Sequence, residues 1–229
     1  MKTTRSIDWV VPTRRKVLSR ATPGESCLTA PPIDDPIDDA AAAVRRIVDA
    51  LARTAPDEAG LPAAAAELQR IAEQLESRTR PVPAQLSEMW QGEGIARHDP
   101  ATGPENPIAP PLTMRDAGGG WAEGVVTLGL PYQGPPALVH GGVCALLLDG
   151  ALAVANQLAG TAGMTAQLDL TYRRPTPLYV ALTVRARRIG REGRKLYTIG
   201  EIVADGQVTV SAQGLFIARG ESGRPGTGT

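Results

Sequence analysis

One carboxylate, Asp149, interrupts an apolar stretch that follows a His140–Gly141–Gly142 turn, in the segment LVHGGVCALLLDGALAVA. Burying an unpaired ionised side chain is costly, so such a group finds a partner or shifts its pKa. Paired glycines before a helix permit a tight turn and expose backbone N–H groups that have no partner within the helix. The helix dipole favours negative charge there, as in sites that stabilise the oxyanion formed when an ester or thioester is attacked. A carboxylate two turns further along can reach the same carbonyl only if a second surface holds the substrate.

Cys144 offers an alternative chemistry, because a thiol near a helix N-terminus and four residues after His140 has the makings of a Cys-His nucleophile. Its neighbours are apolar, however, and no third group that would orient His140 is evident. A Cys among Val and Leu usually packs as a small hydrophobe. The sequence therefore favours Asp149 as the reactive group, and it leaves His140 with two equal roles, a cap of the helix or a contact to substrate.

Composition limits the class of protein. The chain has 229 residues, 42% hydrophobic and 21% charged, with a formal net charge of zero, so it can bury a sizeable core and has no overall charge that calls for nucleic acid. Two cysteines and two histidines are too few for a disulfide scaffold or a zinc site. We therefore expect no metal, no cofactor and a reducing cytoplasm. The Arg-rich start lacks the apolar core of a secretory signal, and Asp149 breaks the central apolar stretch, so we expect no membrane span.

The elements that must position these residues follow from the pattern along the chain. We predict an irregular arm (1–37), a helical extension (38–80), a linker with turns (81–120), a main domain (121–219) and a flexible tail (220–229). The extension contains two amphipathic helices, the first starting at Asp38 or Asp39. Nothing but Ala, Arg and Glu decorates them, so packing is favoured over catalysis. Their apolar faces comprise Val44, Ile47, Val48 and Leu51 in the first helix and Ala64, Leu68, Ile71 and Leu75 in the second.

The main domain is expected to be α+β. The helix from about Gly141 to Leu158 is apolar nearly all round, so we expect it to be buried all round. About five antiparallel strands accompany it, with GREG and DG turns between the last three. One sheet buries a wholly apolar helix by curling around it, which is the architecture called a hotdog fold. We therefore predict a curled antiparallel sheet wrapped around a long apolar helix, with an N-terminal helical extension.

Several motifs in order, HGGVCALLLDGALA, MTAQLDLTYRRPTPL, EGRKLY and GLFIA, resemble the hotdog acyl-CoA thioesterases, in particular the branch with the phenylacetate-pathway thioesterases and the carboxyl-terminal modulator protein. The resemblance covers about Trp121 to Ala218. In that family the helices of two subunits meet at an interface and both chains build each active site. The resemblance thus implies a homodimer or dimer of dimers, and it supplies the missing second surface.

The same resemblance implies roles for single residues. Asp149 matches the family's catalytic carboxylate, a general base or nucleophile, and the Gly141 backbone N–H matches its oxyanion donor. Thr165 matches the residue that orients the attacking water, which we expect to come from the other chain. His140 matches the residue that positions the thioester carbonyl or the loop. The sequence departs from the family at Gly150, where many relatives carry a bulkier residue, and this affects the shape of the acyl pocket.

A basic segment from Arg173 to Lys195 contains eight Arg and Lys residues against the single acid Glu192. Coenzyme A carries a 3′-phosphate and a pyrophosphate, both suited to the planar fork of arginine. In the resembling family the coenzyme contacts positions that match Thr171, Arg173 and Arg194, with Lys195 beside them. The remaining arginines on the strand, Arg185, Arg187 and Arg188, are expected to be solvated. Few aromatic residues accompany this segment, so nucleic acid is a weaker explanation.

The sequence thus predicts an enzyme that hydrolyses acyl-CoA to a free acid and CoA. The alternative is a non-catalytic acyl-CoA-binding or protein-interaction module that keeps the pocket without turnover. An enoyl-CoA hydratase on the same fold is a further rival, but its Asp-His spacing does not occur here.

Overall fold

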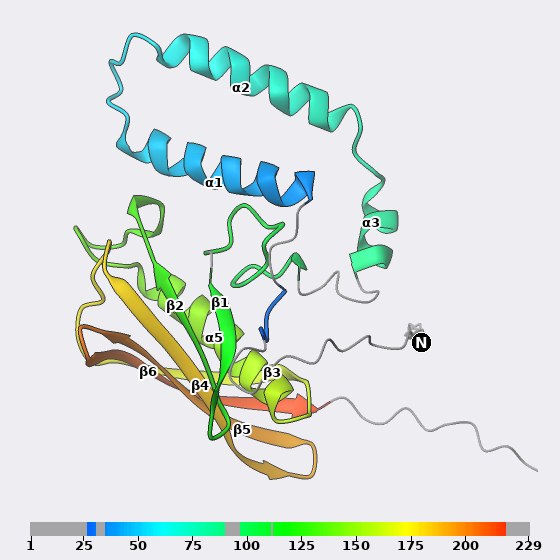
Figure 1. Ribbon diagram of the computed structural model, residues 1–229, viewed down its shortest axis with the longest axis vertical. Coiled ribbons are helices and arrows are strands. Elements are labelled where there is room, and N and C mark those ends of the chain that lie inside the picture. Colours follow the sequence, from blue (N-terminus) through cyan, green and yellow to red (C-terminus); the bar gives the residue numbers. More distant parts are fainter. Residues whose placement is uncertain (1–26, 31–34, 90–96, 111, 219–229) are drawn as a thin grey trace, which may run out of the picture. The chain divides into compact units, whose positions relative to one another are not determined.

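The computed structural model describes residues 27–30, 35–89, 97–110 and 112–218 (Figure 1). The described residues form two compact units. One comprises the described residues between 57 and 95, and the other comprises those between 21 and 56 together with those from 96 onward. The predicted tail lies outside the described residues. Of the predicted arm the structure describes residues 27–30 and 35–37, and the last two of these begin the first helix.

The smaller unit contains two helices, α2 (Leu61–Glu76) and α3 (Val82–Met89). The prediction of a linker from 81 to 120 missed α3, although Pro83 is compatible with the first turn of a helix and good helix formers follow it. In α2 the apolar side chains of Ile71 and Leu75 remain exposed. The second amphipathic helix was predicted to run to about Arg80, and it ends four residues earlier.

Helix α1 (Pro36–Arg53) belongs to the larger unit. Its N-cap is Asp35, whose side chain accepts the Ile37 N–H, so the predicted start at Asp38 or Asp39 was wrong. Those two acids lie in the first turn, where the helix dipole favours negative charge. The predicted extension of residues 38–80 is therefore divided, because only its second helix belongs to the smaller unit.

Six antiparallel strands form one sheet in the order β1-β2-β4-β5-β6-β3, which confirms the α+β fold with a curled antiparallel sheet. The sheet has one strand more than predicted, because the linker prediction missed β1. The glycines at 118–120, which were predicted to lie in the linker, form the turn from β1 into β2, and all three have positive φ angles. The strands are β1 (Thr113–Gly118), β2 (Trp121–Thr127), β3 (Gly163–Tyr172), β4 (Ala181–Glu192), β5 (Lys195–Ala204) and β6 (Gln207–Ala218).

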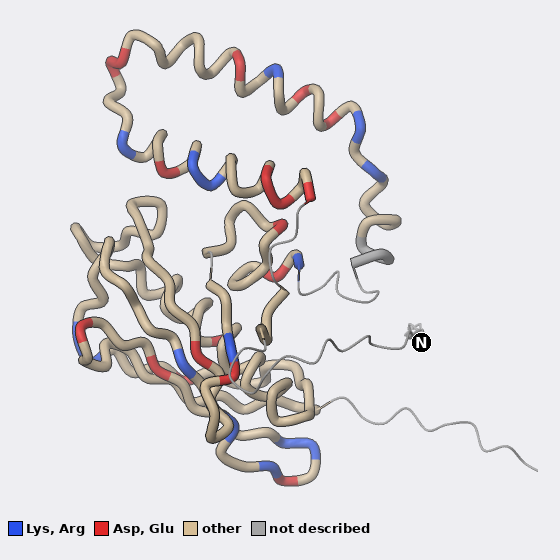
Figure 2. The backbone as a smooth tube through the Cα atoms, in the orientation of Figure 1, with Lys and Arg blue, Asp and Glu red and all other residues tan. Residues whose placement is uncertain are grey.

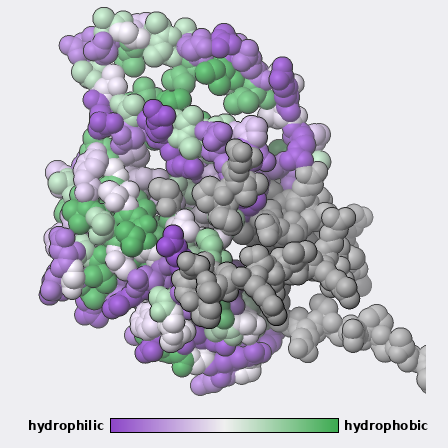
Figure 3. Space-filling view, in the orientation of Figure 1, coloured by the Kyte–Doolittle hydropathy of each residue, from purple (hydrophilic) through white to green (hydrophobic). Residues whose placement is uncertain are grey.

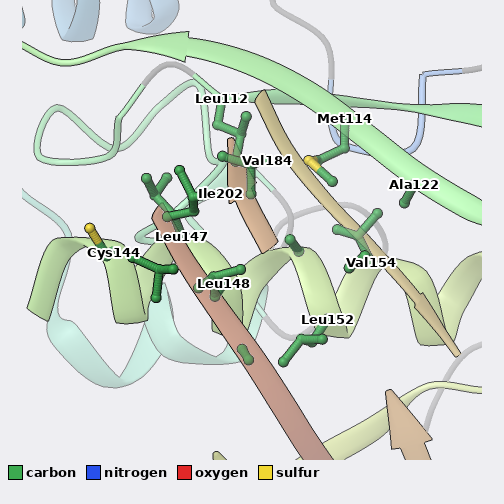
Figure 4. Packing of buried hydrophobic residues seen from close by; sticks show 14 of the residues in the cluster. Leu112, Met114, Ala122, Cys144, Leu147, Leu148, Leu152, Val154, Val184 and Ile202 are labelled. Atoms are coloured by element: carbon green, nitrogen blue, oxygen red, sulfur yellow. The ribbon is translucent and has the colours of Figure 1, made fainter. Parts of the chain in front are cut away.

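Helix α5 (Gly141–Leu158) packs against this sheet with the bounds that the sequence predicted. Leu147, Leu148 and Leu152 on its buried side join Val184 and Ile202 from the sheet in one apolar cluster (Figure 4). The helix is long and apolar enough to cross a membrane, as core helices also can be.

The expectation that α5 is buried all round was wrong for a single chain. Ala145, Leu146 and Ala153 on its other side are only half-buried, because the sheet covers one side of the helix. Apolar residues also reach the visible surface of the strand-containing unit (Figure 3). A short 3-10 turn, η1 (Leu130–Tyr132), precedes the loop that leads into α5.

Candidate active site

His140 caps the N-terminus of α5. Its Nδ1 accepts the Gly142 N–H at 2.9 Å, and its carbonyl oxygen accepts the N–H groups of Val143 and Cys144. Of the two roles that the sequence left open, the structure shows the cap. Because Nδ1 is an acceptor here, a neutral His140 carries its proton on Nε2, at the exposed edge of the ring.

This cap leaves one donor unused. Among the hydrogen bonds that involve described residues, the N–H groups of the next three residues have acceptors but that of Gly141 has none. The Tyr172 hydroxyl lies beside this turn and donates to the Gly141 carbonyl oxygen at 2.9 Å, which holds the Gly141–Gly142 peptide. An unpaired N–H at the positive end of a helix dipole is suited to bind an oxyanion.

Asp149 is half-buried in the middle of α5 and faces β3. Its Oδ1 accepts a hydrogen bond from the Thr165 hydroxyl at 2.8 Å. The Thr165 proton is used in this bond, so its oxygen can only accept further hydrogen bonds. A water molecule beside the pair can therefore donate one proton to Thr165 and direct the other at the carboxylate. We expected Thr165 to come from the other chain, and in the structure it contacts Asp149 of its own chain.

The two groups of this site are far apart within one chain. Eight residues separate Gly141 from Asp149, which corresponds to about 12 Å along an α-helix. This is a long separation for two groups that act on one carbonyl, which extends little more than 1 Å from carbon to oxygen. The structure thus presents two half-sites, one containing Gly141 and Tyr172 and the other Asp149 and Thr165.

Cys144 is buried between α5 and the rest of the domain. Burial raises the pKa of its thiol, which opposes formation of a thiolate at neutral pH. A hydrogen bond with Thr176 acts in the opposite direction but is the smaller effect. A buried, protonated thiol is a poor nucleophile, so the geometry disfavours the Cys-His alternative.

The predicted coenzyme-binding residues also fall into two groups. Thr171 and Arg173 line a depression of about 360 Å³ on the face of the sheet opposite α5, where the Arg173 Nε donates to the Ser211 hydroxyl. Arg194 and Lys195 lie at the hairpin between β4 and β5, which is rich in basic residues (Figure 2). The Arg194 Nε donates to the Ala218 carbonyl oxygen at 3.0 Å.

One chain does not bring Arg173 and Arg194 together. Their contacts, Ser211 and Ala218, lie seven residues apart on β6, a separation of about 23 Å along a strand. The expectation that both arginines bind one coenzyme therefore fails within a single chain.

Of the strand arginines that were expected to be solvated, Arg187 is exposed and Arg185 and Arg188 are half-buried. Arg185 and Arg187 stack on the Trp121 ring, with guanidinium carbons 5.3 and 4.9 Å from its centroid, and Arg185 also pairs with Glu201. Arg188 donates to the carbonyl oxygen of Ala159 at the end of α5. These contacts explain part of the clustering without an anionic ligand.

Sequence reasoning missed Tyr172 as a site residue and considered it only as a stacking surface. The signal was present, because strand alternation places Tyr172 on the same face of β3 as Leu168 and Leu170, which pack toward α5. The described residues contain no group of three or more His, Cys, Asp and Glu side chains that could hold a metal ion.

Comparison with known proteins assigns the family. A solved structure described as protein RHA08564, a thioesterase superfamily protein, is 51% identical to this chain and has a TM-score of 0.77. The similarity covers 86% of this chain and 97% of the other. This chain belongs to the thioesterase superfamily. As a superfamily member it carries an additional module, since residues 28–84 match the family described as the N-terminal helical domain of hypothetical protein RHA1_ro05818.

Part of this superfamily member is also similar to curated proteins. The chain is 38% identical over 92 residues to acyl-coenzyme A thioesterase THEM4 of Bos taurus and 37% identical over 94 residues to that of Mus musculus. The match covers 39% of this chain in both comparisons, and only 38% and 39% of the two mammalian proteins.

Proposed function

We propose that this chain hydrolyses acyl-CoA thioesters to a free acid and CoA, with Asp149 as general base or nucleophile and the Gly141 N–H as oxyanion donor. The observation that carries the proposal is the Asp149–Thr165 hydrogen bond at 2.8 Å on the same helix whose N-terminus presents an unused N–H. Membership in the thioesterase superfamily and the similarity to acyl-CoA thioesterases support this chemistry.

The proposed reaction adds water across the C–S bond. As general base, Asp149 accepts a proton from water while the water oxygen attacks the thioester carbonyl carbon. The carbonyl oxygen becomes negative and accepts the Gly141 N–H, and the C–S bond then breaks as the CoA thiolate leaves and takes up the proton. As nucleophile, the Asp149 carboxylate attacks the carbonyl carbon and the C–S bond breaks as the CoA thiolate leaves. Water then hydrolyses the resulting anhydride, which gives the free acid, restores the carboxylate and supplies the proton for the CoA thiol.

Completion of the site requires a second copy of the chain. Strand β3 lies at the edge of the sheet, so its outer backbone groups are available for pairing with a strand of another molecule. An isologous interface applies the same contact twice. If two β3 strands pair antiparallel with Asp169 at their centre, the bulge between Thr165 and Gln167 brings Tyr172 opposite Thr165 of the partner subunit. Each Gly141 half-site is thereby completed by an Asp149 half-site from the other chain.

The same pairing also unites the basic residues. It places Arg173 opposite Met164 of the partner subunit. Within each chain, Gly163 precedes Met164 and pairs with Ala218, whose carbonyl oxygen accepts the hydrogen bond from Arg194. Arg173 of one copy and Arg194 of the other then lie near one end of the shared site. Thr171 and Lys195 are beside them, so four predicted coenzyme contacts converge when the chain forms a homodimer or a dimer of dimers.

The proposal is tested with a panel of acyl-CoA substrates and a thiol-reactive dye that reports released CoA. We expect release above the uncatalysed rate for at least one substrate. If acyl-CoA binds tightly but no member of the panel releases CoA, the non-catalytic binding module is the correct alternative.

Replacing Cys144 with Ser should leave kcat/KM within a few-fold of the parent value, because the buried thiol does not reach the reacting atoms. Replacement with Ala is the control for burying a new hydroxyl. Thermal unfolding of each variant shows whether it folds. Complete loss of activity in a folded variant would support the thiol mechanism instead.

Replacing Arg194 with Ala should raise KM for full-length acyl-CoA on the order of tenfold, since charge-assisted contacts to phosphate contribute about 1.5–3 kcal/mol and solvent screens this exposed side chain. A truncated acyl-pantetheine thioester, which lacks the nucleotide phosphates, should be affected little. Arg187, which stacks on Trp121, provides a matched Arg→Ala control. Equal damage to both substrates would mean that Arg194 supports the fold or the dimer.

A further inference from the structure

A cleft of about 410 Å³, which we call the Gly141 cleft, opens beside the proposed oxyanion donor. Its lining includes Gly141 and Tyr172, apolar residues of the loop before α5, and Arg173 where β3 ends. Arg173 also lines the depression of about 360 Å³ on the opposite face of the sheet, which we call the outer depression. Arg173 therefore borders both hollows, and a long ligand can pass from one to the other around the end of β3.

Trp121 of β2 forms one wall of the outer depression. Trp121 is half-buried, and the guanidinium groups of Arg185 and Arg187 lie over its ring from the neighbouring strand β4. Neither arginine lines the depression, so the part of the ring that borders the depression is available to a ligand. Aromatic side chains bind planar heterocycles by stacking, as they do with the bases of nucleic acids.

The charges around the outer depression favour a ligand that also carries phosphate. Of its two acids, Glu201 pairs with Arg185, and Asp169 accepts a hydrogen bond from a neighbouring glutamine. In the described part of the chain the exposed Arg173 has no acidic partner, and only its Nε makes a hydrogen bond, to Ser211. The two terminal nitrogens of Arg173 are thus free to bind a phosphate in the bidentate manner of arginine.

Coenzyme A carries its chemical groups in the order that these two hollows require. Its thiol ends an uncharged pantetheine arm, which leads to a diphosphate and then to an adenosine with a 3′-phosphate. With the thioester at Gly141, the pantetheine arm would lie in the Gly141 cleft and the phosphates would reach Arg173. The adenine, the one aromatic group of the coenzyme, would then arrive at the wall formed by Trp121.

We propose that the outer depression binds the adenine of coenzyme A, with Trp121 as the stacking surface. This inference rests on the proposed function, because the thioester at Gly141 sets the direction in which the coenzyme extends. It adds a base-binding residue to the predicted coenzyme contacts Thr171 and Arg173, and it gives the sheet face opposite α5 a part in substrate binding.

The test measures binding, so it does not depend on turnover. The probes are CoA and adenosine 3′,5′-bisphosphate, which keeps the base and the 3′-phosphate but has no pantetheine arm. Titration calorimetry gives their dissociation constants for the full-length chain. Replacing Trp121 with Leu should raise both constants about tenfold, which is a usual effect of losing one stacked base. Replacing it with Phe should raise them no more than about threefold, because a ring that can stack remains.

Two variants are matched controls. Val125→Ala shortens an exposed side chain on the same strand and the same face as Trp121 but outside the depression. Arg187→Ala removes a guanidinium from the ring but leaves the lining of the depression intact. Each should keep both dissociation constants within about threefold of the parent values, and thermal unfolding shows whether each variant folds.

A second readout reports the stacking itself. Trp9→Phe and Trp90→Phe together leave Trp121 as the only tryptophan of the chain. Saturation with adenosine 3′,5′-bisphosphate should quench the fluorescence of Trp121, whereas the same concentration of inorganic phosphate, which has no base, should not.

The outcomes separate this inference from the proposed function. Parental affinity of a folded Trp121→Leu variant for both probes, an equal loss in Trp121→Phe or in either control, or unquenched fluorescence in a saturated complex would each overturn the inference. A parent that binds neither probe would overturn it as well. A parent that binds CoA through Trp121 but releases no CoA from any acyl-CoA would refute hydrolysis alone, and the adenine site would stand.

Discussion

Asp149→Asn should lower kcat on the order of 10²-fold or more, with little change in KM or in thermal stability. The amide has nearly the volume of the carboxylate, and its oxygen can still accept the Thr165 hydroxyl proton that Asp149 accepts at 2.8 Å. It cannot take a proton from water, nor attack a carbonyl carbon, at neutral pH. The measurement is dye-detected CoA release at saturating substrate.

Thr165→Val is the matched control for this variant, because it removes the hydrogen bond and keeps the shape of the side chain. It should lower kcat less than Asp149→Asn does, since the carboxylate remains but loses its orientation. Turnover of Asp149→Asn at the parent rate would rule out Asp149 as base or nucleophile. A loss that appears only in KM would mean that the carboxylate binds substrate without taking part in the chemistry.

Much of this fold was accessible from the sequence because local patterns dominate it. The bounds of α5 were correct, since a Gly-Gly start and an Ala- and Leu-rich stretch act over consecutive residues. The hairpin turns were visible for the same reason. Asp205 and Gly206 both adopt positive φ between β5 and β6, as a DG pair commonly does.

Strand β1 and the loop of residues 97–110 could not be predicted, because long-range contacts determine them. Strand β1 is short, and Arg115 and Asp116 interrupt its apolar pattern, so its pairing with β2 forms without a strong local signal. The loop resembles any segment rich in Pro and Gly until its ion pairs with α1 are known. Neither the contact of Ala101 with Gly150 nor that of Arg97 with Asp38 has a signature in sequence spacing.

For the candidate site, residue types were more predictable than their arrangement. The resemblance pointed to Asp149, Gly141 and Thr165, but only the helical rise shows that about 12 Å along α5 separates the first two within a chain. The contact of Thr165 with Asp149 of its own chain is a tertiary property that the sequence does not show.

Gly141→Pro should lower kcat by about 10²- to 10³-fold, because proline has no N–H and removal of one oxyanion donor has effects of this size. Proline suits the first position of a helix, and His140 has φ −61° and ψ 134°, a conformation that tolerates a following proline. A Cβ at position 141 would lie 3.2 Å from the Tyr172 hydroxyl. The change is therefore made in a Tyr172→Phe background, which removes that hydroxyl.

Gly141→Ala in the same background is the matched control, since it adds a Cβ but keeps the N–H. We expect it to retain activity within about tenfold of Tyr172→Phe alone, as a small steric change beside an intact donor should. Equal losses in the Pro and Ala variants would show that the space at Gly141 matters and that its N–H is not the oxyanion donor.

Mixing the two inactive chains tests whether the site is shared. If each site combines Gly141 of one subunit with Asp149 of the other, a mixed dimer of Asp149→Asn and Gly141→Pro chains has one site with both changes and one with neither. Random reassembly at equal amounts makes half of the dimers mixed, so activity should rise from about 1% or less to about a quarter of the value for the Tyr172→Phe parent. Two Asp149→Asn preparations, mixed in the same way, should show no rise. If the donor and the carboxylate of one chain served the same site, no mixture would recover activity, because every chain would carry a defect.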